Sequence, residues 1–67
     1  MNSIAVLYDR LVTIGETCHE ARSLCEDAVR QVHIKGWFKV QAPGGWIFGH
    51  LTKHGVRLGG NPYLEMS

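Results

Sequence analysis

The chain has 67 residues, of which 45% are hydrophobic and 19% are charged, and its formal net charge is +1. This length leaves room for one small domain, residues 1–67, and the composition argues against a disordered tail. No apolar run approaches the ~18 residues of a membrane span, and no signal-peptide pattern opens the chain. We therefore expect a soluble cytoplasmic protein that has no membrane partner.

The net charge hides an asymmetry between the two halves of the chain. Residues 1–33 carry five acidic and three basic side chains, whereas residues 34–67 carry one acidic and four basic ones. Both tryptophans and both phenylalanines also lie in the second half. The character of the chain changes near residues 33–36, so each half is interpreted separately.

The first half carries apolar or small residues whose spacing alternates between three and four. This seam consists of Ile4, Leu7, Leu11, Ile14, Cys18, Ala21, Cys25, Ala28 and Val32. Such spacing is typical of a helix that packs against another helix, and we predict one long amphipathic helix over residues 3–33. Gly15 costs ~1 kcal/mol in a helix interior, and residues 13–16 and 17–20 both fit a capping box. A break near Gly15 is therefore the alternative.

The predicted helix is too long for the rest of the chain to cover. About 30 helical residues span ~45 Å, whereas a compact chain of this size has a radius of gyration of only ~11 Å. Either the helix breaks and folds back, or another chain covers the seam, and we predict self-association as a homodimer. The predicted oligomer interface is Ile4, Leu7, Leu11, Ile14, Cys18, Ala21, Cys25 and Ala28.

The second half is typical of a β-hairpin, with strand-forming residues at 36–41 and 46–51 and a turn at 42–45. The predicted pairs are Gln41 with Trp46, Val40 with Ile47, and Lys39 with Phe48. Residues 55–59 favour a short third strand, which extends the β-hairpin region over 36–58, and residues 59–67 are interpreted as a tail. The predicted fold class is α+β, a helix followed by a two- or three-stranded antiparallel sheet.

Alternation along the hairpin separates two faces. One presents Phe38, Val40, Ile47 and Leu51, and is interpreted as the core face. The other also carries Gln41, and its predicted partner-binding residues are Trp37, Lys39, Trp46, Phe48 and His50. Large rings beside cations are typical of a surface that binds a protein or stacks on nucleic-acid bases. The alternative is a second core, covered on both sides within a dimer.

No pattern of catalytic or metal-binding residues stands out. Cys18 and Cys25 lie ~10.5 Å apart along a helix, too far for a disulfide, and are interpreted as small buried side chains. His50 and His54 have a spacing that suits zinc on a helix, but His50 is predicted in a strand and no Cys pair accompanies it. We predict no enzyme activity, no metal and no cofactor.

The run Gly36-Trp37-Phe38-Lys39-Val40 with Gly44-Gly45-Trp46-Ile47-Phe48 resembles bacterial SH3-like modules, whose strands carry Gly-Trp pairs. The resemblance covers only the hairpin and implies no residue role. A helix followed by a hairpin is also similar to small phage and mobile-element proteins in general. The prediction for function is a small homodimeric regulatory protein that binds and modulates another protein. The alternative is a small nucleic-acid-binding regulator that uses the same hairpin face.

Overall fold

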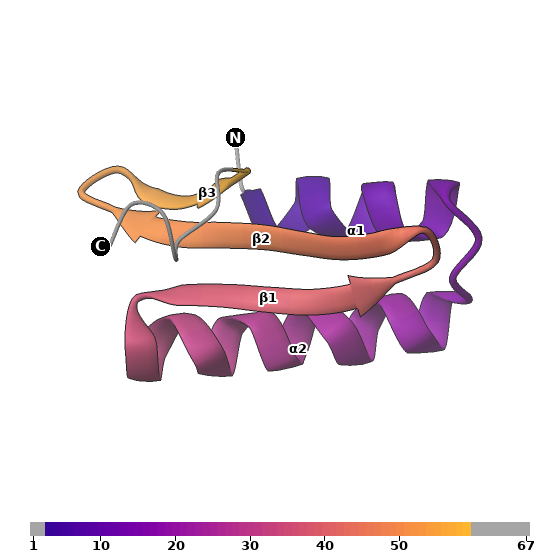
Figure 1. The fold of residues 1–67 in the computed structure, drawn as a ribbon, viewed down its shortest axis with the longest axis horizontal. Helices are drawn as coiled ribbons and strands as arrows, with labels where there is room; N and C mark the ends of the chain where they lie inside the picture. Colours follow the sequence, from indigo (N-terminus) through magenta and orange to yellow (C-terminus); the bar gives the residue numbers. More distant parts are fainter. Residues whose placement is uncertain (1–2, 60–67) are drawn as a thin grey trace.

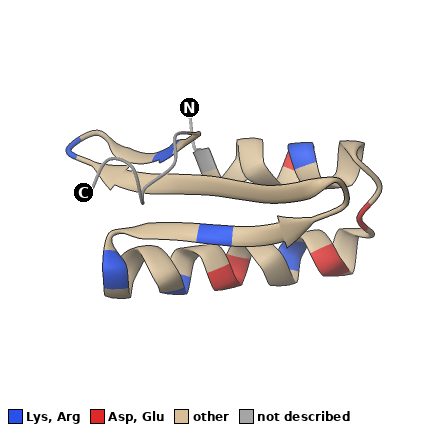
Figure 2. Cartoon of the chain, in the orientation of Figure 1, with Lys and Arg blue, Asp and Glu red and all other residues tan. Residues whose placement is uncertain are grey.

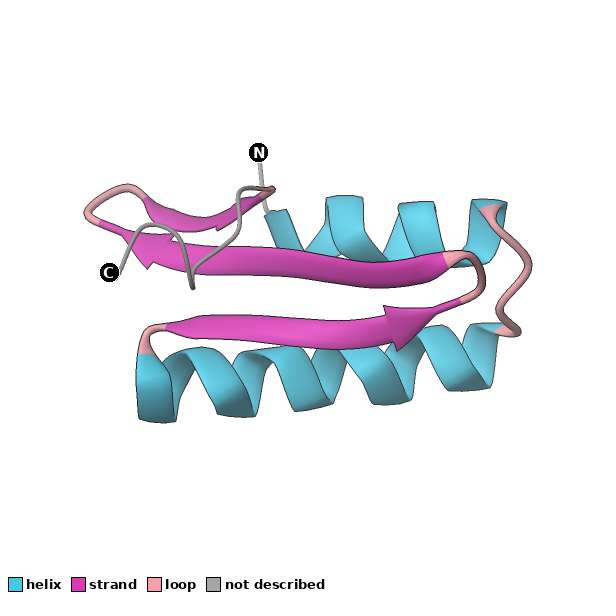
Figure 3. Cartoon of the chain, in the orientation of Figure 1, coloured by secondary structure: helices cyan, strands magenta, loops and turns pink. Residues whose placement is uncertain are grey.

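The computed structural model describes residues 3–59, which form two helices followed by a three-stranded antiparallel sheet (Figure 1). The helices are α1 (Ser3–Thr13) and α2 (Cys18–Lys35), and the strands are β1 (Trp37–Ala42), β2 (Gly45–Thr52) and β3 (Gly55–Leu58). The strand order is β1-β2-β3, and both helices precede the sheet in the chain (Figure 3). The predicted α+β class is confirmed. Of the predicted tail, residues 59–67, only Gly59 is among the described residues.

The chain reverses direction between the helices at residues 14–17. Gly15 has φ +115, and the backbone N–H groups of Gly15 and Glu16 donate to the carbonyl oxygens of Val12 and Leu11 at 3.1 and 3.0 Å. These two bonds form a Schellman motif, which ends α1 and favours glycine at the left-handed position. Thr17 then caps α2, because its Oγ1 accepts from the backbone N–H of Glu20 at 3.0 Å.

The single helix predicted over residues 3–33 is therefore two helices, and the alternative break near Gly15 is confirmed. Folding back places the bulky half of the seam against its small half. Leu7 and Leu11 of α1 and Ala21 and Ala28 of α2 are all 0% exposed within this one chain. The uninterrupted helix over residues 3–33, which the rest of one chain could not have covered, does not form. The argument for a dimer depended on that helix and no longer applies.

The sheet has the predicted register. The pairs Gln41–Trp46, Val40–Ile47 and Lys39–Phe48 all form, and a two-residue turn joins Ala42 to Gly45. The third strand expected from residues 55–59 is β3, which places Leu58 opposite Gly49 and Arg57 opposite His50. Within residues 3–59, neither helix combines the length and the apolar character that crossing a bilayer requires.

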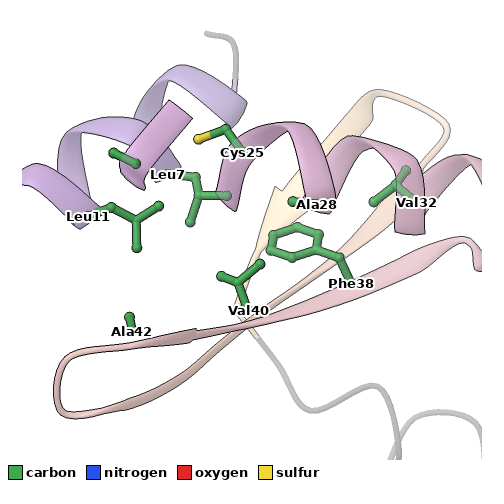
Figure 4. Packing of buried hydrophobic residues seen from close by; sticks show 9 residues of the cluster. Leu7, Leu11, Cys25, Ala28, Val32, Phe38, Val40 and Ala42 are labelled. Atoms are coloured by element: carbon green, nitrogen blue, oxygen red, sulfur yellow. The ribbon is translucent and has the colours of Figure 1, made fainter. Parts of the chain in front are cut away.

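The core lies between the sheet and the helix pair. Phe38, Val40 and Ala42 of β1 point toward the helices, where Leu7, Leu11 and Cys25 lie (Figure 4). Gly49 is the direct cross-strand neighbour of Phe38, and a Cβ atom at Gly49 would overlap the Phe38 ring. The ring therefore occupies the space that a side chain on β2 would otherwise take.

Leu51 was predicted on the core face of the sheet, but its side chain is more exposed than that prediction implies. It pairs with Val56 on the helix side of the sheet, as alternation requires, but remains 53% exposed. The end of β2 and the turn to β3 extend past the start of α1, so this end of the sheet has less helix beneath it (Figure 1). Phe38, Val40 and Ile47 contribute to the core as predicted.

Gly49→Ala should lower the free energy of unfolding by about 1–3 kcal/mol, because the new methyl group overlaps the Phe38 ring in a closely packed core. Urea denaturation measures this cost. Phe38→Leu in the same chain should relieve part of the overlap, so the double variant should lose less than the sum of the two single losses. Strict additivity would contradict the proposed packing of ring against glycine.

The pKa of Glu16 is raised, first by a hydrogen bond with the side chain of Glu20, and further by desolvation and the charge of Glu20. The folded protein therefore holds this proton more tightly than the unfolded chain, and the associated stability is lost as pH rises through the raised pKa. Glu16→Gln keeps a donor to Glu20 at every pH. Its melting temperature relative to the wild type should rise from about pH 4 to about pH 7.

Glu26→Gln provides the control for this pH dependence. Glu26 is an exposed residue of α2 that lies away from the Glu16–Glu20 pair in sequence, and its substitution removes the same charge. If both variants follow the same pH profile relative to the wild type, the coupling between Glu16 and Glu20 does not contribute to stability.

Candidate binding face of the sheet

The helices cover one side of the sheet, and within residues 3–59 no helix or strand lies over the other side. The register gives this open face eight residues with side chains: Trp37, Lys39 and Gln41 of β1, Trp46, Phe48, His50 and Thr52 of β2, and Arg57 of β3. All five predicted partner-binding residues thus lie on one surface. Whether they bind a partner stays a prediction.

The central strand carries a row of flat rings. Trp46, Phe48 and His50 alternate with residues that face the helices, so successive rings are about 7 Å apart along β2. Trp46 is 51% exposed, while Phe48 and His50 are half-buried. Trp37 lies opposite His50 on β1. A large apolar ring that is half exposed in a chain this small contributes little to the core.

Two lysines lie against the tryptophan rings. The Nζ atom of Lys39 is 4.9 Å from the ring centroid of Trp46, and that of Lys35 is 4.2 Å from the ring centroid of Trp37. An ammonium group over an indole ring is attracted by the negative ring face, by about 0.5–1 kcal/mol at exposed sites. The lysine ammonium groups therefore contact the tryptophan rings directly, so the cations and the rings form one continuous patch.

Charge divides the molecule into two layers. The described acidic residues lie on α1, α2 and the loop between them, whereas the charged residues of the strands and the β2–β3 turn are all basic (Figure 2).

Arg57 and Lys35 were not among the predicted site residues. Arg57 reaches the open face because β3 pairs with β2 beside His50, a placement that requires the register of a third strand. Lys35 is the last residue of α2, next to the strand that carries Trp37.

The backbone at Lys39 is held from α2 by the side chain of Gln31. The Gln31 amide nitrogen donates to the Lys39 carbonyl oxygen, and the Gln31 amide oxygen accepts from the Lys39 N–H, both at 3.0 Å. The amide nitrogen also donates to the Asp27 carboxylate at 2.8 Å, which fixes the orientation of the amide. Gln31 thus pairs with the edge of β1 in the way a neighbouring strand would.

The predicted oligomer interface has a different environment. Leu7, Leu11, Ala21, Cys25 and Ala28 are buried in the core of a single chain, and Ile4 packs against that core. Only Ile14 and Cys18 are exposed. The seam is therefore the contact between α1 and α2 of the same chain, and most of its surface is already enclosed.

A groove of about 430 Å³ runs between the two helices. Ile4, Tyr8, Cys25 and Val29 line much of it, and the Cys25 thiol donates to the carbonyl oxygen of Ile4 at 3.8 Å. Burial raises the pKa of Cys25, so the thiol stays protonated at neutral pH and is a poor nucleophile. A hydrogen bond with Cys18 raises the pKa of Tyr8, which keeps its phenol protonated as well.

Both cysteines are free; Cys25 is buried as predicted, whereas Cys18, at the exposed start of α2, is not. Among the described residues, no three His, Cys, Asp or Glu side chains gather closely enough to hold a metal ion.

Comparison of the chain with protein-family models, with curated proteins and with solved structures finds no significant match.

Gln31→Glu should destabilise the protein by about 1–3 kcal/mol, because it removes the donor to Lys39 and to Asp27 and places a second carboxylate beside Asp27. Urea denaturation measures the loss; the hydrogen bond from the Lys39 N–H should persist, because a carboxylate oxygen at position 31 still accepts it. Adding Asp27→Asn restores a donor and removes the repulsion, so the double variant should recover part of the loss. An unchanged denaturation midpoint for Gln31→Glu would show that the two hydrogen bonds donated by Gln31 do not contribute to stability.

Proposed function

We propose that this chain is a small non-enzymatic interaction protein whose binding surface is the open face of its sheet. The observation that carries the proposal is the half-exposed Trp46 ring, in a row with Phe48 and His50 on the side of the sheet that the helices leave bare. Exposed tryptophan and arginine side chains are the types that most often dominate binding energy at interfaces.

The groups of the open face favour binding over catalysis. They are aromatic rings, an ammonium, a guanidinium, an imidazole and an amide on a flat surface, which does not enclose a substrate away from water. The thiol and the phenol with shifted pKa values line the separate groove between the helices, and both are protonated at neutral pH.

The size of the open face limits the kind of partner. Three strands, the longest with eight residues, give a surface of about 15 by 27 Å, or about 400 Å². A stable interface between globular proteins takes about 800 Å² from each partner. An extended segment that lies across the strands fits this area better than a second globular surface. If the partner is another protein, as predicted from the sequence, we propose that it presents such a segment.

The charge of the face points to an anionic segment. Residues 28–64 contain neither Asp nor Glu, so the strands and the turns between them carry Lys39, Lys53 and Arg57 but no carboxylate side chain. Acidic protein segments and single-stranded nucleic acids both meet these conditions, and the second is favoured by the row of rings. The proposal uses a single chain, because most of the seam predicted to join two chains is enclosed within one.

Trp46→Ala distinguishes a binding face from a second core. If the ring is a binding group, truncation should lower the free energy of unfolding by at most about 1 kcal/mol, the contribution of its contact with Lys39. Phe38→Ala, on the opposite side of the same hairpin, is the matched control and should lose about 3–5 kcal/mol. Thermal and urea denaturation measure both. A loss at Trp46 as large as that at Phe38 would overturn the proposed function.

A further inference from the structure

We infer that the open face binds single-stranded nucleic acid, with bases stacked on the rings of β2 and phosphates beside cations of the flanking strands. The inference rests on the proposed function and commits it to one class of partner. It also assigns phosphate contacts to Lys53, as the sequence suggested, and to Arg57, which was not among the residues predicted from the sequence.

The row of rings supplies the stacking surface. Trp46, Phe48 and His50 lie on the central strand, about 7 Å apart, with no bulky aliphatic side chain between them on that face. Every base has a flat aromatic face, so a row of rings accepts a strand without requiring a particular sequence. An acidic peptide has no repeated flat group that would use this spacing.

Cations border the row on both sides. Lys39 lies opposite Phe48 on β1, Arg57 lies opposite His50 on β3, and Lys53 lies in the β2–β3 turn. Phosphates that flank a stacked base would therefore meet a positive charge on either side of β2. The Lys39 ammonium already contacts the Trp46 ring, which places a cation beside the position where a base would stack.

The remaining charges favour this orientation of an anionic strand. The five acidic side chains of the described chain, Asp9, Glu16, Glu20, Glu26 and Asp27, belong to the helix layer and its loop, away from the strands (Figure 2). The helix layer also carries four basic side chains, so its net charge is only −1, whereas the strands and the β2–β3 turn carry three basic side chains and no acidic one. A polyanion is therefore attracted more strongly to the sheet side than to the helix side.

The centre of the β1 edge is already occupied, which disfavours binding of an extended peptide by strand addition there. Strand addition needs unpaired backbone N–H and C=O groups, and at Lys39, in the centre of β1, both groups are bonded to Gln31. An extended ligand on the β1 side is therefore directed onto the open face, where side chains rather than backbone groups make the contacts.

The test is fluorescence anisotropy with the full chain and three labelled probes of about twelve units: an oligothymidylate, a DNA duplex and an oligoglutamate peptide. The oligothymidylate should bind best. Trp46→Ala should weaken its binding by about 5- to 150-fold, the range for loss of one stacked base. Arg57→Gln should reduce the slope of log affinity against log salt by about 0.7, the value for one phosphate contact on a single strand.

Arg30→Gln is the matched control for Arg57→Gln, because it removes an arginine from the exposed side of α2 in the helix layer. It should leave affinity and salt slope unchanged. Equal effects of Arg30 and Arg57, or a duplex that binds as well as the single strand, would overturn the inference and indicate unspecific attraction.

The outcomes also separate this inference from the proposed function. If the oligoglutamate binds with dependence on Trp46 while the oligothymidylate does not, the nucleic-acid inference is overturned and an acidic protein segment takes its place. Failure of every probe to bind a folded protein likewise overturns the nucleic-acid inference. Unfolding of Trp46→Ala in the denaturation experiment overturns both proposals, because the ring would then be part of a core.

Discussion

The reversal of the chain between α1 and α2 determines which surfaces of this protein face inward. The two halves of the seam are complementary, with leucines in α1 and alanines and a cysteine in α2. Small side chains let helix backbones approach closely, and the leucines fill the space that this approach leaves. Without the left-handed Gly15 and the Thr17 cap, the leucines would lie on a continuous helix far from the alanines.

The same reversal prepares the platform on which the sheet packs. Two short helices side by side match a sheet of three strands, and the 18-residue α2 and the eight-residue β2 are each about 27 Å long. Phe38 fixes the hairpin on this platform by placing its ring over Gly49. Because both helices pack on one side of the sheet, neither of them covers the other side, where the rings of β2 lie.

Much of the sheet was accessible from sequence because its determinants are local. The Pro43–Gly44 turn sets the register, and strict alternation then assigns each side chain to a face. The continuity of the helix was not accessible in the same way. The three–four spacing continues from Leu11 through Ile14 to Cys18 whether or not the chain bends. It therefore indicates that a helix packs against another helix, but not whether that second helix belongs to the same chain or to another one. The Thr17–Glu20 capping pattern was the local signal for the break.

The residues that sequence reasoning missed at the site depend on tertiary placement. Arg57 joins the open face only once β3 is paired in register with β2, and Lys35 meets Trp37 across the Gly36 turn. Gln31 looks like an ordinary polar helix position, since nothing in its neighbourhood in the sequence indicates a bond to Lys39. Leu51 was assigned to the correct side, but burial also depends on how far α1 extends.

The bond pair between Gln31 and Lys39 also affects how copies of the protein meet at high concentration. Sheets associate edge to edge when both edges present unpaired backbone groups, and repetition of that contact produces fibrils. Here the Gln31 side chain occupies the backbone groups at the centre of the β1 edge and interrupts the row of groups that an added strand would need. Open-ended pairing needs two open edges on every copy, so an interruption at the centre of one edge works against polymerisation.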